Sequence, residues 1–371
     1  MLGIEPFLFG KYSTDGPFTE GSMRGLGVPE RYVGIFADAA NGGNSRRTWK
    51  QRRTVLRTIE KCARETATPL DFPWGDRELQ TYVGWSMEEG KKGNTITQYI
   101  SNVASLHREM GLQMNVANKH LITTVVKGHG NLAENAPGRI PMTPDLMFHL
   151  KLKLSRSNLP VPERRLVWVI ATTLFQGSFR VGELLSPTKK KFCPDSTLLG
   201  SDINWESATL GGRQVDLLKV RVKCPKETRG HQVVDVELFD LSDCFYNCVS
   251  AFRKWRGASS LPLDPNLPLF RHEDGSLVTP NYFNMLLKDL MQDKVQYMQG
   301  FIATHSFRSG LASVMAQLGY SDEQIKLQGR WRGDAFMNYI KLGRAARLED
   351  QWALANKIAN LVLPGGQVGR H

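Results

Sequence analysis

The chain has 371 residues and a net charge of +12, and hydrophobic residues make up 41% of it. A chain of this length can form two domains of ordinary size, each with an apolar core. The composition excludes a low-complexity or collagen-like chain, and no apolar run reaches the roughly 18 residues that span a membrane. The positive charge favours a polyanionic partner, nucleic acid first and an anionic membrane surface second.

The N-terminal segment MLGIEPFLFGKYSTDG lacks a basic stretch followed by an apolar block, so we expect no secretory signal. Residues 1–28 contain frequent glycine and no periodicity, which predicts an irregular segment.

The five cysteines are scattered, which argues against a disulfide framework and favours a reducing compartment. Cys244 and Cys248 are one helical turn apart, but no second ligand pair follows, so we expect buried thiols and no metal.

Residues 29–132 are predicted to form an all-helical DNA-binding domain. The segment 45–65 is typical of a helix, because apolar residues recur in it at helical spacing. It holds eight Lys and Arg against two Glu, so its basic side either follows phosphates or is a solvated face. Further helices are expected over about 76–89, 94–111 and 115–128. The residues predicted to contact DNA here are Arg46, Arg47, Lys50, Arg52, Arg53, Lys91 and Lys92.

A Pro- and Gly-rich stretch over 133–143 predicts an interdomain linker, followed by a second domain over 144–371. Helices are expected at about 144–155 and 163–177. Three helix starts are marked by Thr143-Pro144, Thr279-Pro280 and the capping box of Ser321 with Gln324. Apolar residues alternate over 218–222 and 234–238 around a polar turn, which predicts a β-hairpin. The second domain is therefore α+β, mainly helical, with a small antiparallel sheet.

Separated pieces of the second domain carry residues suited to phosphate chemistry. They are Arg180 and Glu183 in GSFRVGEL, Lys226 in the hairpin turn, His305 and Arg308 in ATHSFRSG, and Tyr339 in GRWRGDAFMNYI. With these residues in this order, the chain resembles the tyrosine recombinase (phage integrase) superfamily from about residue 45 to 362. Its ending looks most like recombinases of eukaryotic DIRS-like and crypton-like mobile elements.

Physical chemistry suggests a task for each of these residues. Two guanidinium groups, here Arg180 and Arg308, can grip the oxygens of a phosphodiester as its charge grows during attack. Glu183 would orient Arg180 or a neighbouring group. The resemblance implies that Tyr339 attacks phosphorus, leaving a 3′-phosphotyrosyl link and a free 5′-hydroxyl, without ATP or a metal.

Proton transfer would need further groups. His305 is expected to assist proton transfer from the tyrosine or to bond a phosphate oxygen. Lys226 is the candidate general acid for the departing 5′-oxygen, with Lys223 as the competing choice.

Three features stay open at this level. The family places His or Trp about nine residues before the tyrosine. Counting back from Tyr339 gives Arg330 at that position, with Trp331 next to it. Either Trp331 is the catalytic group there, or Arg330 donates to the phosphate as a DNA contact. Lys189, Lys190 and Lys191 suit backbone phosphates, but they also suit nuclear import or a solvated loop. The amphipathic segment 345–363 packs within the chain or, as in the family, docks on a neighbouring protomer.

The leading hypothesis is a site-specific DNA recombinase or integrase that exchanges strands through a Holliday junction. It implies no cofactor, no membrane, double-stranded DNA as the partner and a homo-tetramer on DNA from a free monomer or dimer. A type IB topoisomerase, a hairpin-forming resolvase and an inert DNA-binding relative are the alternatives. We expect a nuclear location for a eukaryotic mobile element, and otherwise the cytoplasm or nucleoid.

Overall fold

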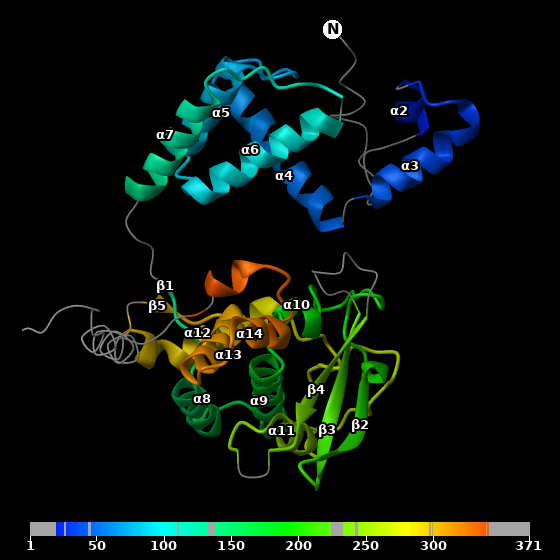
Figure 1. Cartoon of the computed structure of the whole chain (residues 1–371), viewed down its shortest axis with the longest axis vertical. Coiled ribbons are helices and arrows are strands. Elements are labelled where there is room, and N and C mark those ends of the chain that lie inside the picture. The colour runs from blue at the N-terminus through cyan, green and yellow to red at the C-terminus, as the bar shows by residue number, and fades with distance from the viewer. Residues whose placement is uncertain are drawn as a thin grey trace, which may run out of the picture. The chain divides into compact units, whose positions relative to one another are not determined.

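The computed structural model describes residues 20–25, 27–43, 46–109, 111–132, 138–223, 233–241, 244–296, 298, 300–338 and 340. Contacts between residues divide the chain into two units, Met1–Ala136 and Pro137–His371. Figure 1 shows the helices and strands of each unit, and each unit has its own hydrophobic core. The division falls within the segment 133–143 for which the sequence predicts a linker.

The first unit is built from helices. They are α2 (Glu20–Gly25), η1 (Glu30–Tyr32), α3 (Val33–Gly42), α4 (Arg46–Glu65), α5 (Asp76–Glu88), α6 (Gly93–Glu109) and α7 (Lys119–Leu132). The main core lies among α4 to α7 and includes Ile59, Trp74, Tyr82 and Val103. The helices predicted over 45–65, 76–89 and 94–111 are confirmed, since their apolar stripes face this core.

Two expectations about this unit are wrong. Residues 20–25 form a helix inside the stretch expected to be irregular, because Met23 packs on α3 and Arg24 bonds Glu30 at 2.7 Å. These contacts come from residues outside the short helix, and the helix is too short to show a periodic apolar pattern in the sequence.

Helix α7 begins at Lys119 rather than near residue 115. The reason is the Asp76 carboxylate at the start of α5, which accepts the N–H groups of Ala117 at 3.2 Å and Asn118 at 2.9 Å. The preceding backbone is also held, since the Asn115 N–H donates to the Trp74 carbonyl at 3.0 Å. These bonds keep the segment before Lys119 as a loop.

The second unit combines helices with two small sheets. Its elements are β1 (Gly138–Arg139), α8 (Pro144–Arg156), α9 (Val161–Gln176), α10 (Val181–Leu184), η2 (Gly200–Asp202), β2 (Ile203–Leu210), β3 (Arg213–Val222), β4 (Val234–Phe239), α11 (Cys248–Arg256), α12 (Pro280–Val295), β5 (Gly300–Phe301), α13 (His305–Gln317), α14 (Asp322–Gly329) and η4 (Asp334–Asn338). The helix starts predicted at Thr143, Thr279 and Ser321 are confirmed, because each side-chain oxygen accepts a backbone N–H.

Helix α9 forms the centre of this unit. Most of its residues from Leu166 to Phe175 are buried, and α8, α11 and α13 pack against it. A helix that is apolar on most sides is stable only when other elements surround it. None of the described helices combines the length and the apolarity needed to cross a membrane.

The main sheet is antiparallel, with strand order β2-β3-β4. The predicted hairpin is β3 with β4, in which Leu218 pairs with Leu238. Strand β2 has no apolar pattern of its own, because Ile203 is its only buried residue and no alternation marks it. It is joined to β3 through Gly211 and Gly212, whose φ angles of 55° and 77° suit a tight hairpin turn.

The second half of the predicted linker belongs to the core of this unit. Strand β1 pairs in parallel with β5, and Ile140 and Met142 after it are buried. The Met142 N–H donates to the Ser306 carbonyl at 2.8 Å. This segment therefore fixes the first turn of α13.

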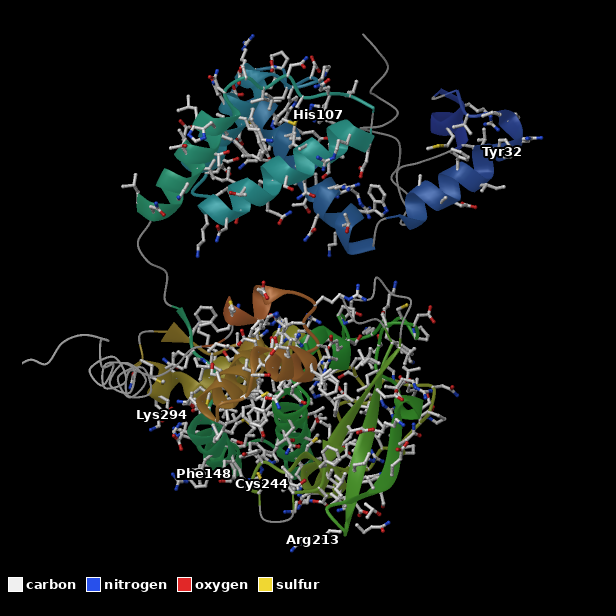
Figure 2. All side chains as sticks on the ribbon, viewed as in Figure 1. Tyr32, His107, Phe148, Arg213, Cys244 and Lys294 are labelled. Atoms are coloured by element: carbon white, nitrogen blue, oxygen red, sulfur yellow. The ribbon has the colours of Figure 1, made fainter. Side chains whose placement is uncertain are left out.

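The buried imidazole of His107 ties α6 to the loop before α5, and Figure 2 marks its place in the first unit. Its Nε2 accepts the Trp74 N–H at 2.8 Å, and its Nδ1 lies 2.8 Å from the Val103 carbonyl. This pattern requires the neutral ring with a proton on Nδ1. Burial lowers the pKa of His107 below its ordinary value of 6.5.

We therefore expect the free energy of unfolding to fall as the pH drops below about 6.5, because the unfolded chain then binds a proton that folded His107 rejects. Each unit of pKa difference is worth about 1.4 kcal/mol. Urea unfolding between pH 8 and 5 measures the effect. The variant His107→Gln should flatten this dependence, whereas exposed His120→Gln should not. An unchanged slope in His107→Gln would contradict the assignment.

Candidate active site

The turn after α9 presents backbone carbonyl groups to the residues of α13 and α14. Ser178 has a φ of 47°, a left-handed conformation that is uncommon for a residue other than glycine. Gly177 leaves no space for a side chain, because a Cβ atom there would lie 2.1 Å from the Phe179 ring. The N–H groups of Gly177 and Phe179 bond back to the last turn of α9. The carbonyls of Gly177 and Ser178 are therefore held in fixed positions.

Arg308 lies on α13 with 1% of its surface exposed. Its Nη1 donates to the Ser178 carbonyl at 2.6 Å, and its Nη2 donates to the Gly329 carbonyl. Its guanidinium carbon lies 4.3 Å from the centre of the Trp331 ring, a cation–π contact. A Cβ atom on Gly310 would lie 1.9 Å from the Met142 carbonyl oxygen, so this glycine lets α13 approach close enough to bury the arginine.

Arg180 and Glu183 are the N-cap and the third residue of the short helix α10. Arg180 is the N-cap residue, and its backbone N–H donates to Glu183 Oε2 at 2.9 Å. Its Nη1 donates to Glu183 Oε1 at 3.1 Å. The side chain of Arg180 is 18% exposed and that of Glu183 is 6% exposed. The carboxylate thus orients Arg180 while leaving part of its guanidinium open to solvent.

Arg330 and Trp331 follow α14, and both contact residues of this site. Arg330 has a φ of 55°, and its Nη2 donates to Glu183 Oε2 at 3.1 Å. Its Nη1 donates to the Gly177 carbonyl at 2.8 Å. A Cβ atom on Gly329 would lie 1.6 Å from the Trp331 ring, so this glycine allows the indole to lie against Arg308. Arg330 thus supports Glu183, and Trp331 supports Arg308.

These residues form one connected set, the arginine cluster, made of Arg180, Glu183, Arg308, Arg330 and Trp331. Glu183 bonds two of its arginines, and the Ser178 carbonyl accepts from Arg308 and Arg330. Three guanidinium groups against one carboxylate leave an excess of positive charge. Such a site suits an anion with several oxygens, such as a phosphodiester.

Helix η4 follows the arginine cluster in the chain. Helix η4 ends at Asn338, and Phe336 on it is 0% exposed in a small core between α13 and α14. Lys326 lies 2.8 Å from Asp334 at the start of η4, and this hydrogen bond raises the pKa of Lys326. Tyr339 itself and the predicted C-terminal helix over 345–363 lie outside the described residues.

The groups proposed for proton transfer are only partly described. His305 is the first residue of α13, one turn before Arg308, and is partly exposed. Lys223 is held in the protein, with its Nζ 2.7 Å from Asp202 Oδ2 and 2.9 Å from the Pro194 carbonyl. Lys226, the preferred general acid, lies outside the described residues. Among the described residues, no three His, Cys, Asp or Glu side chains meet as metal ligands.

The predicted DNA-contacting residues are placed in different ways. On α4, the exposed or partly exposed basic side chains follow one face, where Lys61 is paired with Glu89; the other four we call the α4 basic face (Lys50, Arg53, Arg57 and Arg64). Within the described part of the chain, none of these four forms an ion pair. Lys92, Lys189, Lys190 and Lys191 are exposed, and Lys91 is partly exposed. The side chains of Arg46 and Arg47 are not among those that the structure describes.

Arg52 requires a correction. It is 7% exposed, forms an ion pair with Glu109 on α6, and lies over the Trp49 ring at 4.6 Å. The expectation that Arg52 lies on the DNA-contacting face with Arg53 is wrong. One step along a helix turns a side chain by about 100°, and that step carries Arg52 from the basic face into the interior.

The sequence did not identify the backbone groups of the site. The carbonyls of Gly177, Ser178 and Gly329 accept bonds from Arg308 and Arg330, yet every residue type carries such a carbonyl. The only signal is a glycine two residues before an aromatic residue, in GSF and in GRW. These glycines mark places where the backbone approaches a ring too closely for a side chain.

Comparison with solved structures identifies the fold. The chain is mainly helical, and its second unit carries a small antiparallel sheet. This fold matches that of the tyrosine recombinase catalytic domains. No protein-family profile matches the sequence, and no curated protein matches it.

Solved structures give the particular likenesses. The XerH site-specific recombinase, bound to a palindromic difH substrate, is 12% identical with a TM-score of 0.55, covering 91% of this chain and 85% of its own. Lambda integrase (75–356), a dimer bound to a COC′ core site, is 15% identical with a TM-score of 0.53, covering 84% and 93%. The Tn1549 transposon integrase, in complex with a circular intermediate DNA, is 12% identical with a TM-score of 0.50, covering 90% and 97%. At these identities the likeness is one of fold.

The first prediction for the site concerns Glu183. We expect Glu183→Ala to lower the free energy of unfolding by about 3 kcal/mol, because it strips two largely buried arginines of their shared carboxylate. Glu183→Gln should cost about half as much, because the amide oxygen still accepts one hydrogen bond. Urea unfolding of the full chain measures both.

The matched control is Glu206→Ala, which removes the more exposed carboxylate 3.2 Å from Lys219 on the sheet. Its expected cost is below about 1 kcal/mol. Equal losses in Glu183→Ala and Glu206→Ala would show that the arginine cluster does not depend on Glu183.

Proposed function

We propose that this chain is a DNA strand transferase of the tyrosine recombinase or integrase kind, with Tyr339 as its nucleophile. The observation that carries the proposal is the convergence of Arg180, Glu183, Arg308, Arg330 and Trp331 from three separate segments, the last of which shortly precedes Tyr339 in the chain. The recombinase fold supports it, and so does the α4 basic face on the first unit.

In the proposed reaction, the phenol oxygen of Tyr339 attacks the phosphorus of a DNA strand. The bond from phosphorus to the 5′-oxygen breaks, so that the strand is held by a 3′-phosphotyrosyl bond. The leaving 5′-oxygen takes a proton from Lys226, and the proton of the phenol passes to His305 or to water. The reverse attack by a 5′-hydroxyl rejoins a strand without any external energy source.

The arginine cluster would stabilise the charge that develops on the phosphate. Arg180 has the more exposed guanidinium and would bond one non-bridging oxygen in the ground state. Arg308 is nearly buried, so it would donate to the phosphate by exchanging one of its carbonyl bonds for a phosphate oxygen. Glu183 and Arg330 would act as positioning residues, and Trp331 would exclude water beside the scissile bond.

The full cycle we propose is site-specific recombination, with two rounds of strand exchange through a Holliday junction. It brings together two DNA duplexes and four copies of the chain, and the segment 345–363 is proposed to link neighbouring copies. A eukaryotic mobile element of the DIRS-like or crypton-like kind is the proposed origin, with action in the nucleus.

A DNA-binding protein without cleavage activity is the second candidate. The observation that favours it is the low exposure of Arg308, whose two Nη atoms bond backbone carbonyls. The two candidates differ in one respect that can be measured, the formation of a covalent bond to DNA.

A nicked suicide substrate tests the proposal, because the short 5′ fragment leaves and the adduct accumulates. We expect the full chain to form a covalent adduct that Tyr339→Phe abolishes. Arg180→Ala should slow adduct formation by about 10²–10³-fold, as does the loss of one transition-state donor elsewhere. Arg308→Ala should slow it similarly while most DNA binding is kept. An adduct that persists in Tyr339→Phe would reject this nucleophile, and no adduct at all would favour the second candidate.

DNA binding by the α4 basic face gives a separate prediction. Replacing Lys50 and Arg53 with Gln should weaken binding at 100 mM salt and reduce the slope of log affinity against log salt by about 1.8, roughly 0.9 for each lost phosphate contact. Gel-shift titrations at several salt concentrations measure it. The double variant Lys153→Gln and Lys219→Gln is the control, since both lysines lie on the second unit and are paired with carboxylates. An equal slope change in both variants would reject a specific role for this face.

A further inference from the structure

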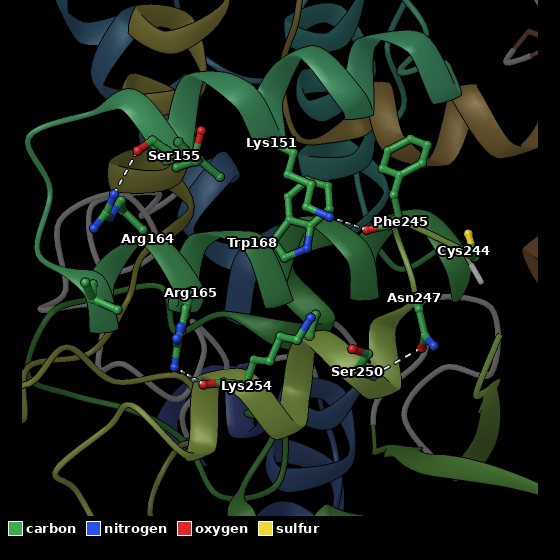
Figure 3. A pocket seen from close by; sticks show the side chains of 13 residues that line it. Lys151, Ser155, Arg164, Arg165, Trp168, Cys244, Phe245, Asn247, Ser250 and Lys254 are labelled. Atoms are coloured by element: carbon green, nitrogen blue, oxygen red, sulfur yellow. Dashed lines mark hydrogen bonds between the residues drawn. The ribbon is translucent and has the colours of Figure 1, made fainter. Parts of the chain in front are cut away.

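A pocket of about 600 Å³ opens on the second unit between α8, α9 and α11. Figure 3 shows Lys151 and Ser155 on α8, Arg164, Arg165 and Trp168 on α9, and Lys254 on α11 around it. The pocket lies along the first half of α9, whereas the arginine cluster begins after its last residue, Gln176. At 1.5 Å per residue, the span from Arg165 to Gln176 is about 16 Å, so the two sites are distinct.

The pocket gathers positive charge. Its lining contains Lys151, Arg164, Arg165 and Lys254 and no Asp or Glu. Within the described part of the chain, none of these four cations forms an ion pair. The neighbouring cations Lys153 and Arg253, by contrast, are each paired with Asp side chains. The cations of the pocket thus differ from the neighbouring cations, because they have no carboxylate partner among the described residues.

The protein holds three of these cations in place with its own backbone and aromatic rings. Arg164 donates to the Ser155 carbonyl at 2.8 Å, and Arg165 donates to the Lys254 carbonyl at 3.0 Å. Lys151 donates to the Phe245 carbonyl at 3.2 Å and lies 5.6 Å from the centre of the Trp168 ring. Each of these bonds uses one donor group only, so each cation keeps further donors for a ligand.

Burial, together with the charge of nearby Lys254, lowers the pKa of Lys151. A lowered pKa means that the site disfavours its own positive charge when no anion is present. An anion with more than one charge would remove this penalty, because it would pair with several cations at once.

We infer that this pocket binds an oligophosphate, either the phosphate chain of a nucleoside triphosphate or free inorganic triphosphate. Its volume falls within the range of small-molecule sites. Two arginines and two lysines match the charge of a linked phosphate chain better than that of a single phosphate. The partly exposed Trp168 ring offers a flat surface for a base, should the phosphate chain belong to a nucleotide.

Calorimetric titration of the full chain at about 150 mM salt tests the inference, with inorganic triphosphate, ATP and AMP as the probes and no metal ion added. We expect triphosphate and ATP to bind, and AMP to bind at least tenfold more weakly. Tighter binding of ATP than of triphosphate identifies a nucleotide as the occupant, and equal binding identifies the inorganic chain. Either result supports an oligophosphate site.

Variants separate this pocket from the proposed DNA-binding surfaces. Arg165→Gln with Lys254→Gln removes two exposed charges of the pocket and should weaken triphosphate binding at least tenfold. Lys153→Gln with Arg156→Gln removes two charges of α8 that do not line the pocket and should leave binding unchanged. Lys189→Gln, Lys190→Gln and Lys191→Gln together should also leave it unchanged.

Three outcomes would overturn the inference. They are the absence of triphosphate binding, equal affinity for AMP and triphosphate, and a loss of binding that is the same in the pocket variant and in either control. Thermal unfolding of each variant confirms that it is folded before its binding is compared. Because the proposed strand transfer plays no part in these measurements, this inference and the proposed function fail independently.

Discussion

The second unit is organised around one buried cation, the guanidinium group of Arg308. Burying such a group without partners would cost several kcal/mol. The protein avoids this cost by directing two backbone carbonyls and the face of an indole at it. Those carbonyls come from the turn after α9 and from the end of α14, so the cation joins segments that are distant in the chain.

The positions of these carbonyls depend on unusual backbone. Ser178 and Arg330 both adopt the left-handed conformation, which costs of order 1–3 kcal/mol for residues other than glycine. Gly177 and Gly329 stand beside them, where any side chain would strike an aromatic ring. Strain of this kind persists only where the surrounding contacts over-determine it, and it is common at functional sites. Arg330 also bonds Glu183, which in turn orients Arg180.

Helix α9 connects two regions of positive charge with different surroundings. At its C-terminal end, the arginines of the cluster are bonded to Glu183 and to main-chain carbonyls. Along its first half, the cations of the pocket have carbonyl and aromatic partners but no described carboxylate. The central helix is rigid because most of its residues between these regions are buried. It can therefore support two anion sites that do not share a residue.

The sequence alone determined most of the local structure. Periodic apolar residues predicted α4, α5, α6, α8 and α9, and three cap signatures placed helix starts correctly, because these signals depend on residues within one or two turns. The ordered motifs around Arg180, Arg308 and Tyr339 predicted a recombinase-like fold, which the structure has. The bounds of strand β2 depend on its pairing with β3, because it has no apolar pattern of its own.

Only the tertiary structure decided which charges are buried and what they contact. Arg52 and Arg53 are adjacent and identical in type, yet Arg52 is bonded to Glu109 inside the first unit and Arg53 lies on its basic face. Arg330 and Trp331 were alternatives in the sequence, and the fold gives each a different partner. The physical reason is that burial of a charge depends on groups far along the chain, whose approach no local pattern encodes.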